Sequence, residues 1–326
     1  MAALVSVSGV DVRVGMHPAD FWKNFGLGEE LSIAGAFTYN GLRRFYELRK
    51  LDQPDEVFEV LYNLAVGIER LLKIAVVLLE HAEDEDQAAL EQSLITHNHL
   101  DLLHRIRCHA AINLAGPHNE FLALLATFYR SHRYDRFSIS SITSPGKDRD
   151  ALCRYFSKQL DMELPTPDSL FGTPNEARHK KFLQKVVNKI CRELYDLIQS
   201  QAGQLNLGTH ELRHGSKAET IFLGEADIPA ENVLWKELLL FFMNTKSTSG
   251  YLEFLRSIPP LDFDPELVGD YLDCFQSDAA KALASDELKH LYEELEEKGK
   301  RTRLVEVIGS PGAYFHEDED EEEEPR

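Results

Sequence analysis

The sequence predicts a mainly α-helical protein built around an up-and-down helical bundle. Two observations support this prediction: residues 55–81 form a nearly all-apolar segment, and most of the remaining chain has helical periodicity. Within residues 55–81, apolar side chains recur at i, i+3 and i+4, and further apolar residues nearly surround the helix that they would form. A helix that is apolar on almost every side is typical of the centre of a bundle.

Helix start and stop signals divide the rest of the chain. Pro54 and Asp55 separate a helix over about 38–50 from the central segment, and Thr96 or Asn98 can cap the helix that follows it. The other predicted helices cover about residues 119–129, 150–160, 176–200, 229–244, 247–256, 264–275 and 279–298.

Two short segments have the features of strands instead. Residues 4–14 alternate apolar and polar side chains around Gly9, which predicts a short N-terminal β element. Residues 220–223, Thr-Ile-Phe-Leu, form the second candidate strand. Neither segment is long enough to change the mainly α prediction.

A chain of 326 residues is long enough for about two domains. An additional helical region is expected to follow the bundle, because the later predicted helices also carry apolar faces that need burial. The expected organisation is an N-terminal extension (1–28), a bundle with basic loops (29–200), a C-terminal helical region packed on the bundle (201–313) and a disordered acidic tail (314–326).

The net charge of −20 is unevenly distributed. Residues 317–324 are an unbroken run of eight acids, which is expected to be disordered and solubilising. Mimicry of nucleic acid, or masking of a basic surface, is the alternative role for this run. Residues 128–192 instead carry thirteen Lys or Arg and seven Asp or Glu, which indicates an anionic ligand.

The composition also indicates a compartment. No apolar run reaches the roughly 20 residues that a membrane helix needs, and the N-terminus lacks the features of a secretory signal. The four cysteines are far apart and include no Cys-x-x-Cys pair, as is common in a reducing environment. We therefore expect a cytoplasmic protein without a membrane partner, and no motif predicts a cofactor.

One pattern connects the central helix with the next. Gly67 to Lys73 (Gly-Ile-Glu-Arg-Leu-Leu-Lys) is followed by a variable loop and by Thr96-His97, which leads into Leu100 to Leu103. This pattern resembles the HEPN superfamily of helical-bundle proteins over about residues 30–140. The resemblance implies an RNA- or nucleotide-binding bundle in a prokaryotic defence or toxin–antitoxin setting. Glu69 and Lys73, four residues apart, are expected to form a structural ion pair.

Many HEPN proteins are ribonucleases whose signature is an arginine, four to six residues and then a histidine. No arginine of this chain has a histidine at that offset, and Arg105 to His109 is one residue too short. The standard metal-independent ribonuclease site is therefore not expected.

Residues 128–137 have the composition that best suits a functional site. This segment interleaves three arginines and one histidine with four aromatic residues, which suits phosphate contacts and base stacking. Cations at the end of a helix are also stabilised by its dipole, and aromatic residues there can simply close a core. The RNA- or anion-binding candidates are Arg130, Arg133, Tyr134 and Arg136. Two histidines are weak candidates for acid–base catalysis: His132, which lies in this segment, and His97.

Two further groups are weaker candidates. His97, Asp101, His104 and Cys108 share one stripe if they lie on one helix, and the first three are weak zinc-ligand candidates. A capping histidine followed by a polar helix face is the expected arrangement, because the set of metal ligands is incomplete.

The second group lies in the loop 211–217. Its Arg213 and Lys217, beside Gly215, can bind a phosphate as a secondary anion loop. A plain surface turn explains the same residues.

The sequence thus supports RNA or nucleotide binding as the principal hypothesis. A ribonuclease with a non-standard site is the first alternative. The second is a non-catalytic module that forms a homodimer through the bundle or binds a partner protein.

Overall fold

The computed structural model describes residues 18–81, 87–135, 137, 139, 146–164, 172–224, 228–275 and 278–310. The described residues form helices and one isolated β-bridge, between Lys50 and Pro174, so the mainly α prediction is confirmed. The candidate strand at 4–14 and the acidic tail lie outside the described residues. The chain divides into two compact units, Met1–Glu231 and Asn232–Arg326.

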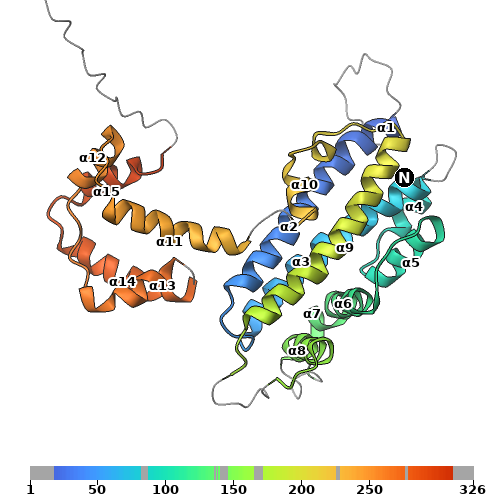
Figure 1. Cartoon of the computed structure of the whole chain (residues 1–326), viewed down its shortest axis with the longest axis horizontal. Coiled ribbons are helices and arrows are strands. Elements are labelled where there is room, and N and C mark those ends of the chain that lie inside the picture. Colours follow the sequence, from blue (N-terminus) through green and yellow to red (C-terminus); the bar gives the residue numbers. More distant parts are fainter. Residues whose placement is uncertain are drawn as a thin grey trace, which may run out of the picture. The chain divides into compact units, whose positions relative to one another are not determined.

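The first unit is a helical bundle in which α2, α3 and α9 lie side by side (Figure 1). These three helices span Leu27–Glu47, Pro54–Glu80 and Ala177–Gln204. The shorter elements are α1 (Pro18–Phe21), α4 (Gln87–Ser93), α5 (His99–His109), α6 (Gly116–Thr127), α7 (Arg133–Asp135), α8 (Lys147–Leu160) and α10 (Lys217–Phe222). Two π-helical turns, η1 (Trp22–Gly26) and η2 (Phe128–His132), and a 3₁₀ turn, η4 (His210–Leu212), complete the unit.

The helix α3 occupies the centre of the bundle. It begins with Pro54 in its first turn, and its buried positions cover nearly all sides from Val57 to Leu78. The neighbours α2, α5, α8 and α9 pack around it. The prediction of a central helix at residues 55–81 is therefore confirmed, and its burial on all sides explains the lack of a polar face.

The contact between α2 and α3 requires glycine at two positions. A Cβ atom added to Gly67 would lie 2.5 Å from Thr38 Oγ1 and 2.9 Å from the carbonyl oxygen of Ala34. A Cβ atom on Gly41 would lie 2.7 Å from Leu64 Cγ. The two backbones approach this closely only because neither glycine carries a side chain.

The prediction of a strand at residues 220–223 is wrong, because these residues overlap the helix α10. Ser216 caps this helix by accepting a hydrogen bond from the Glu219 amide at 3.0 Å. Ile221 and Phe222 are buried where α10 packs against α2 and α9. Residues 201–231 accordingly belong to the first unit, whereas the sequence-based boundary separates them from the bundle.

The second unit contains shorter and more exposed helices. They are α11 (Ile228–Asn244, beginning in the last residues of the first unit), α12 (Gly250–Ser257), η5 (Pro265–Leu267), α13 (Val268–Cys274), α14 (Asp278–Glu294) and α15 (Lys298–Val307). No side chain is buried among those that the structure describes from residue 233 onward. A search of the described helices finds none with the length and apolar character required to cross a membrane.

We expect the substitution Gly67→Ala to lower the free energy of unfolding by about 1–3 kcal/mol, because the added methyl group overpacks the contact between α2 and α3. Helix propensity alone would favour alanine by about 1 kcal/mol, so the predicted sign is opposite to that of propensity. Urea denaturation followed by circular dichroism measures the change.

The matched control is Gly203→Ala in α9, where an added Cβ atom meets no other atom within 4 Å. It should be neutral or stabilising. Equal effects of the two substitutions would contradict a close contact at Gly67.

Candidate anion-binding site

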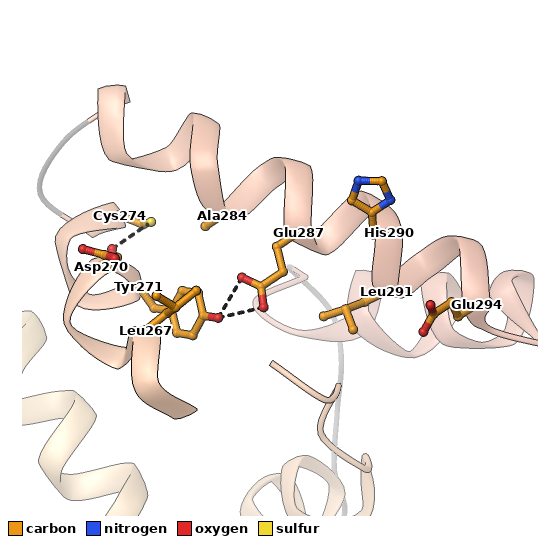
Figure 2. A pocket seen from close by; sticks show the side chains of 9 residues that line it. All are labelled: Leu267, Asp270, Tyr271, Cys274, Ala284, Glu287, His290, Leu291 and Glu294. Atoms are coloured by element: carbon orange, nitrogen blue, oxygen red, sulfur yellow. Dashed lines mark hydrogen bonds between the residues drawn. The ribbon is translucent and has the colours of Figure 1, made fainter. Parts of the chain in front are cut away.

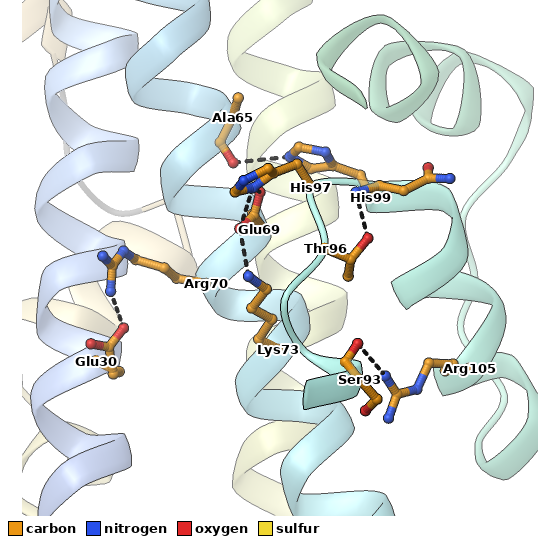
Figure 3. Close-up of polar contacts among 11 residues, drawn as sticks. Glu30, Ala65, Glu69, Arg70, Lys73, Ser93, Thr96, His97, His99 and Arg105 are labelled. Atoms are coloured by element: carbon orange, nitrogen blue, oxygen red, sulfur yellow. Dashed lines mark hydrogen bonds and ion pairs between the residues drawn. The ribbon is translucent and has the colours of Figure 1, made fainter. Parts of the chain in front are cut away.

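A polar group of five residues lies at the surface of the bundle beside α3, and we call it the Glu69 cluster. Its members are Glu69, Lys73, His97, Tyr129 and Arg133. Figure 3 shows Lys73 and His97 both pointing toward the Glu69 carboxylate. Lys73 Nζ donates to Glu69 Oε1 at 2.7 Å, and His97 Nδ1 lies 3.1 Å from Oε2. The expected ion pair between Glu69 and Lys73 is therefore formed.

Burial distinguishes the carboxylate from its partners. The Glu69 side chain is only 8% exposed, whereas Lys73 is 25% and His97 is 45% exposed. A carboxylate removed from water in this way needs partners that replace its hydration, and the two nitrogen groups supply them. Glu69 thus fixes the position of two more accessible groups that can face a ligand.

The loop before α5 brings His97 to this position. Asn98 caps α5 by accepting a hydrogen bond from the Leu100 amide at 3.2 Å, and Thr96 Oγ1 accepts from the Asn98 amide at 3.2 Å. These local bonds hold the turn in which His97 lies, ahead of the first helical residue, His99. His97 is therefore not part of a helical stripe with Asp101 and His104.

His99 anchors the same loop from inside the bundle. Its side chain is fully buried, and Nε2 donates to the carbonyl oxygen of Ala65 on α3 at 2.9 Å (Figure 3). Burial lowers the pKa of His99 below its ordinary value of 6.5, so the buried ring favours the neutral form.

Tyr129 and Arg133 complete the cluster from η2 and α7. The Tyr129 ring lies edge-on to the His97 ring at 4.7 Å, and the Arg133 guanidinium lies 3.9 Å from the centre of the Tyr129 ring. Arg133 also lies 4.4 Å from the ring of Tyr134, which is exposed. The pKa of Tyr129 is raised by burial and by the neighbouring Glu69 charge. The π-helical turn at Phe128–His132 is of the kind that often occurs at functional sites.

Cations outnumber carboxylates in the cluster. Lys73 and Arg133 carry two positive charges, whereas Glu69 carries one negative charge. Arg130, also on η2, is exposed, and its side chain has no hydrogen bond or ion pair with another described residue. The arrangement can accept an anion beside the exposed ring of Tyr134.

His132 lies in a different environment from His97. Its Nδ1 atom is 3.3 Å from Asp148 Oδ1, and the Asp148 side chain is only 5% exposed. Asp148 belongs to the first turn of α8, where a carboxylate is stabilised by the helix dipole. The two histidines that the sequence identifies as weak catalytic candidates therefore lie beside two different carboxylates, and of the two only His97 forms a hydrogen bond with its carboxylate.

The remaining candidates are not brought into the Glu69 cluster. Arg136 lies outside the described residues. Asp101 and His104 are exposed on α5, where His104 Nε2 lies 4.0 Å from Cys108 Sγ. Within the described part of the chain, no three His, Cys, Asp or Glu side chains form a group that could hold a metal ion.

The loop 211–217 already contains a carboxylate partner. Glu219 Oε2 accepts a hydrogen bond from the Gly215 amide at 2.6 Å and lies 3.2 Å from His214 Nδ1. Arg213 and Lys217 are exposed beside it. The amide that would bind a phosphate in this loop is therefore bound to the protein's own side chain.

Comparison of the chain with known proteins finds no matching family model, curated protein or solved structure. Sequence reasoning missed two arrangements, the contact of His97 with Tyr129 and the pairing of His132 with Asp148. Both join residues far apart in the chain, and no spacing rule signals them.

We expect the free energy of unfolding to decrease as the pH falls from about 7 to about 5, in part because of His99. Its pKa is lowered in the folded protein, so the unfolded chain binds protons first as the pH falls below 6.5. The stabilising free energy from His99 is fully present above pH 6.5 and is lost as the pH falls toward the pKa of His99 in the folded protein. Denaturant titrations at several pH values measure it.

The substitution His99→Gln keeps a donor for the Ala65 carbonyl and removes the titrating group. It should make the decrease in stability with falling pH smaller, whereas the exposed-site control His104→Gln should leave the decrease unchanged. The same pH dependence in all three proteins would rule out the role assigned to His99.

Proposed function

We propose that this protein binds RNA or a nucleotide through the Glu69 cluster and the adjoining surface of η2 and α7. The observation that carries the proposal is the position of the Arg133 guanidinium, which lies 3.9 Å from the centre of the Tyr129 ring and 4.4 Å from the centre of the Tyr134 ring. One of its N–H groups donates to the Tyr134 hydroxyl, which fixes the guanidinium at the surface with N–H groups left for a phosphate. The exposed ring of Tyr134 suits base stacking.

Three features of the surrounding surface support an anionic ligand. Arg130 extends the positive surface and is exposed on η2. His97 and Lys73 are partly exposed and are held by the buried Glu69. Tyr134 is 58% exposed, so its ring is available to a base. The cytoplasmic location and the defence or toxin–antitoxin setting belong to the same proposal and rest on sequence features alone.

A filter-binding titration with short single-stranded RNAs tests this proposal. We expect the substitutions Arg130→Ala and Arg133→Ala each to weaken binding by about tenfold, the effect of losing about 1.4 kcal/mol of charge-assisted contact. Each loss of a phosphate contact should also lower the salt dependence by a slope of about 0.7.

The matched control is Arg303→Ala on α15, which removes an exposed arginine from the second unit. Arg213→Ala tests the loop 211–217 in the same assay. Binding that is insensitive to salt, or that is weakened equally by all four substitutions, would contradict the proposed surface.

Phosphodiester cleavage is a second candidate function, and one observation favours it. His97 Nδ1 is bound to the buried Glu69, while no described residue forms a hydrogen bond with its Nε2. A carboxylate that orients an imidazole and stabilises its protonated form is a common arrangement for a general base. In this mechanism, His97 Nε2 accepts the proton of the attacking 2′-hydroxyl group, and Arg133 stabilises the charge that develops on the phosphate. The new P–O2′ bond replaces the P–O5′ bond, and the 5′-oxygen leaves with a proton from water.

If this second function is present, purified protein should cleave RNA equally well with and without EDTA. The substitution His97→Ala should lower the rate by about 100-fold or more, because general acid–base catalysis contributes at least that factor. His132→Ala serves as the comparison, since His132 lies beside Asp148, outside the Glu69 cluster. Intact RNA under both conditions, or equal loss in the two variants, would rule out catalysis by His97.

A further inference from the structure

The second unit contains a groove between α13 and α14 with a volume of about 540 Å³ (Figure 2). This volume lies within the range of about 300–1,000 Å³ that is common for small-molecule sites. Much of the groove is lined by apolar groups, namely Leu267, Ala284, Leu291 and the ring of Tyr271. Ala284, Glu287, Leu291 and Glu294 share one face of α14 because they are separated by three or four residues.

Negative charge surrounds this apolar surface. Asp270 lines the groove from α13, and Glu287 and Glu294 line it from α14. No lysine or arginine lines the groove, and none of the three carboxylates forms an ion pair with a lysine or arginine among the described residues. Carboxylates beside an apolar surface attract a cation more strongly than carboxylates in open solvent do.

The carboxylate of Glu287 is held in place before any ligand binds. Tyr271 Oη lies 2.7 Å from both oxygens of Glu287 and donates its proton to the pair, as the dashed lines in Figure 2 show. The Asp264 amide also donates to Glu287 Oε1 at 3.2 Å. Such prior positioning lowers the entropy cost of binding a charged group.

The spacing of the two glutamates defines the length of a ligand. Glu287 and Glu294 are two helical turns apart, so their backbone positions are separated by about 10.5 Å along α14. Leu291 lies between them in Figure 2. A matching ligand has two positive charges at about this separation and an apolar chain between them.

We propose that this groove binds a linear aliphatic diamine or polyamine. One ammonium group pairs with Glu287, on the side where Asp270 adds a second negative charge. The methylene chain lies against Leu291, and the other ammonium group pairs with Glu294. The proposed amine site consists only of residues of the second unit and is independent of the Glu69 cluster.

The thiol of Cys274 reports binding in the groove, because this residue also lines it. Cys153 and Cys191 are buried and Cys108 is exposed, so a full-length Cys108→Ser protein leaves Cys274 as the accessible thiol. Diaminoheptane at about ten times its Kd should slow alkylation of Cys274 by iodoacetamide about tenfold. Heptanediol, which has the same chain without charge, should not slow it. An amine bound only to the acidic residues 317–324 would also leave the alkylation rate unchanged.

Variants of the two glutamates complete the test. Glu287→Gln and Glu294→Gln should each raise the concentration for half-maximal protection about tenfold, as expected for one charge-assisted contact. Glu306→Gln, on α15, removes an exposed charge outside the groove and should leave protection unchanged.

Circular dichroism checks that each variant keeps its helices. The Glu294 side chain has no hydrogen bond with another described residue, so its variant gives a test that does not depend on the contact between Tyr271 and Glu287. Absence of protection by diaminoheptane, equal protection by heptanediol, or protection unchanged in both glutamate variants would overturn the proposal.

Discussion

The candidate site of the bundle depends on one buried carboxylate. Glu69 lies on α3, which is otherwise apolar on nearly all sides, and a charge in that position is stable only with partners that replace water. Lys73 on the same helix and His97 from the following loop supply these partners. The carboxylate therefore joins the loop before α5 to the centre of the bundle. His99, bound to the Ala65 carbonyl, joins the same loop to α3 one turn earlier.

The position of His97 connects this buried interaction to the surface. Its ring contacts Tyr129, and Tyr129 in turn supports the guanidinium of Arg133. A chain of contacts thus runs from a buried charge to a half-buried arginine and an exposed tyrosine. Removal of Glu69 would release both of its partners, whereas removal of Arg130 would change only the surface charge. Glu69 therefore positions the other side chains of the site, whereas Arg130 would act by contacting the ligand.

Local features of the site and fold were predictable from the sequence. The central helix follows from apolar periodicity, and the Glu69–Lys73 pair from a spacing of four residues. Residue type limits the helix cap to Thr96 or Asn98, and the structure shows that Asn98 is the cap. The contact between His97 and Glu69 spans 28 residues and depends on how the helices pack, so no local pattern reveals it. Residues 220–223 show the opposite case. Their β-branched and aromatic composition favours a strand, but the Ser216 cap and burial of Ile221 and Phe222 against α2 and α9 favour a helix.

The two units differ in the charge that they offer to a ligand. The Glu69 cluster combines cations with aromatic rings, whereas the groove between α13 and α14 combines carboxylates with aliphatic side chains. The basic composition of residues 128–192 indicates the cationic site in the sequence. Nothing in the sequence indicates the acidic groove, because Asp270 and the two glutamates of α14 belong to a generally acidic region. Only the packing of α13 against α14 brings them around one cavity.

Ultraviolet cross-linking of a short RNA to the full-length protein, followed by mass spectrometry of the adducts, locates the surface that binds RNA. We expect adducts at Tyr129, Tyr134 or His97, because these rings lie beside the arginine that would hold the phosphate. Adducts confined to the loop 211–217 or to the second unit would rule out binding at the Glu69 cluster, as would the absence of any adduct under conditions in which a known RNA-binding protein is labelled.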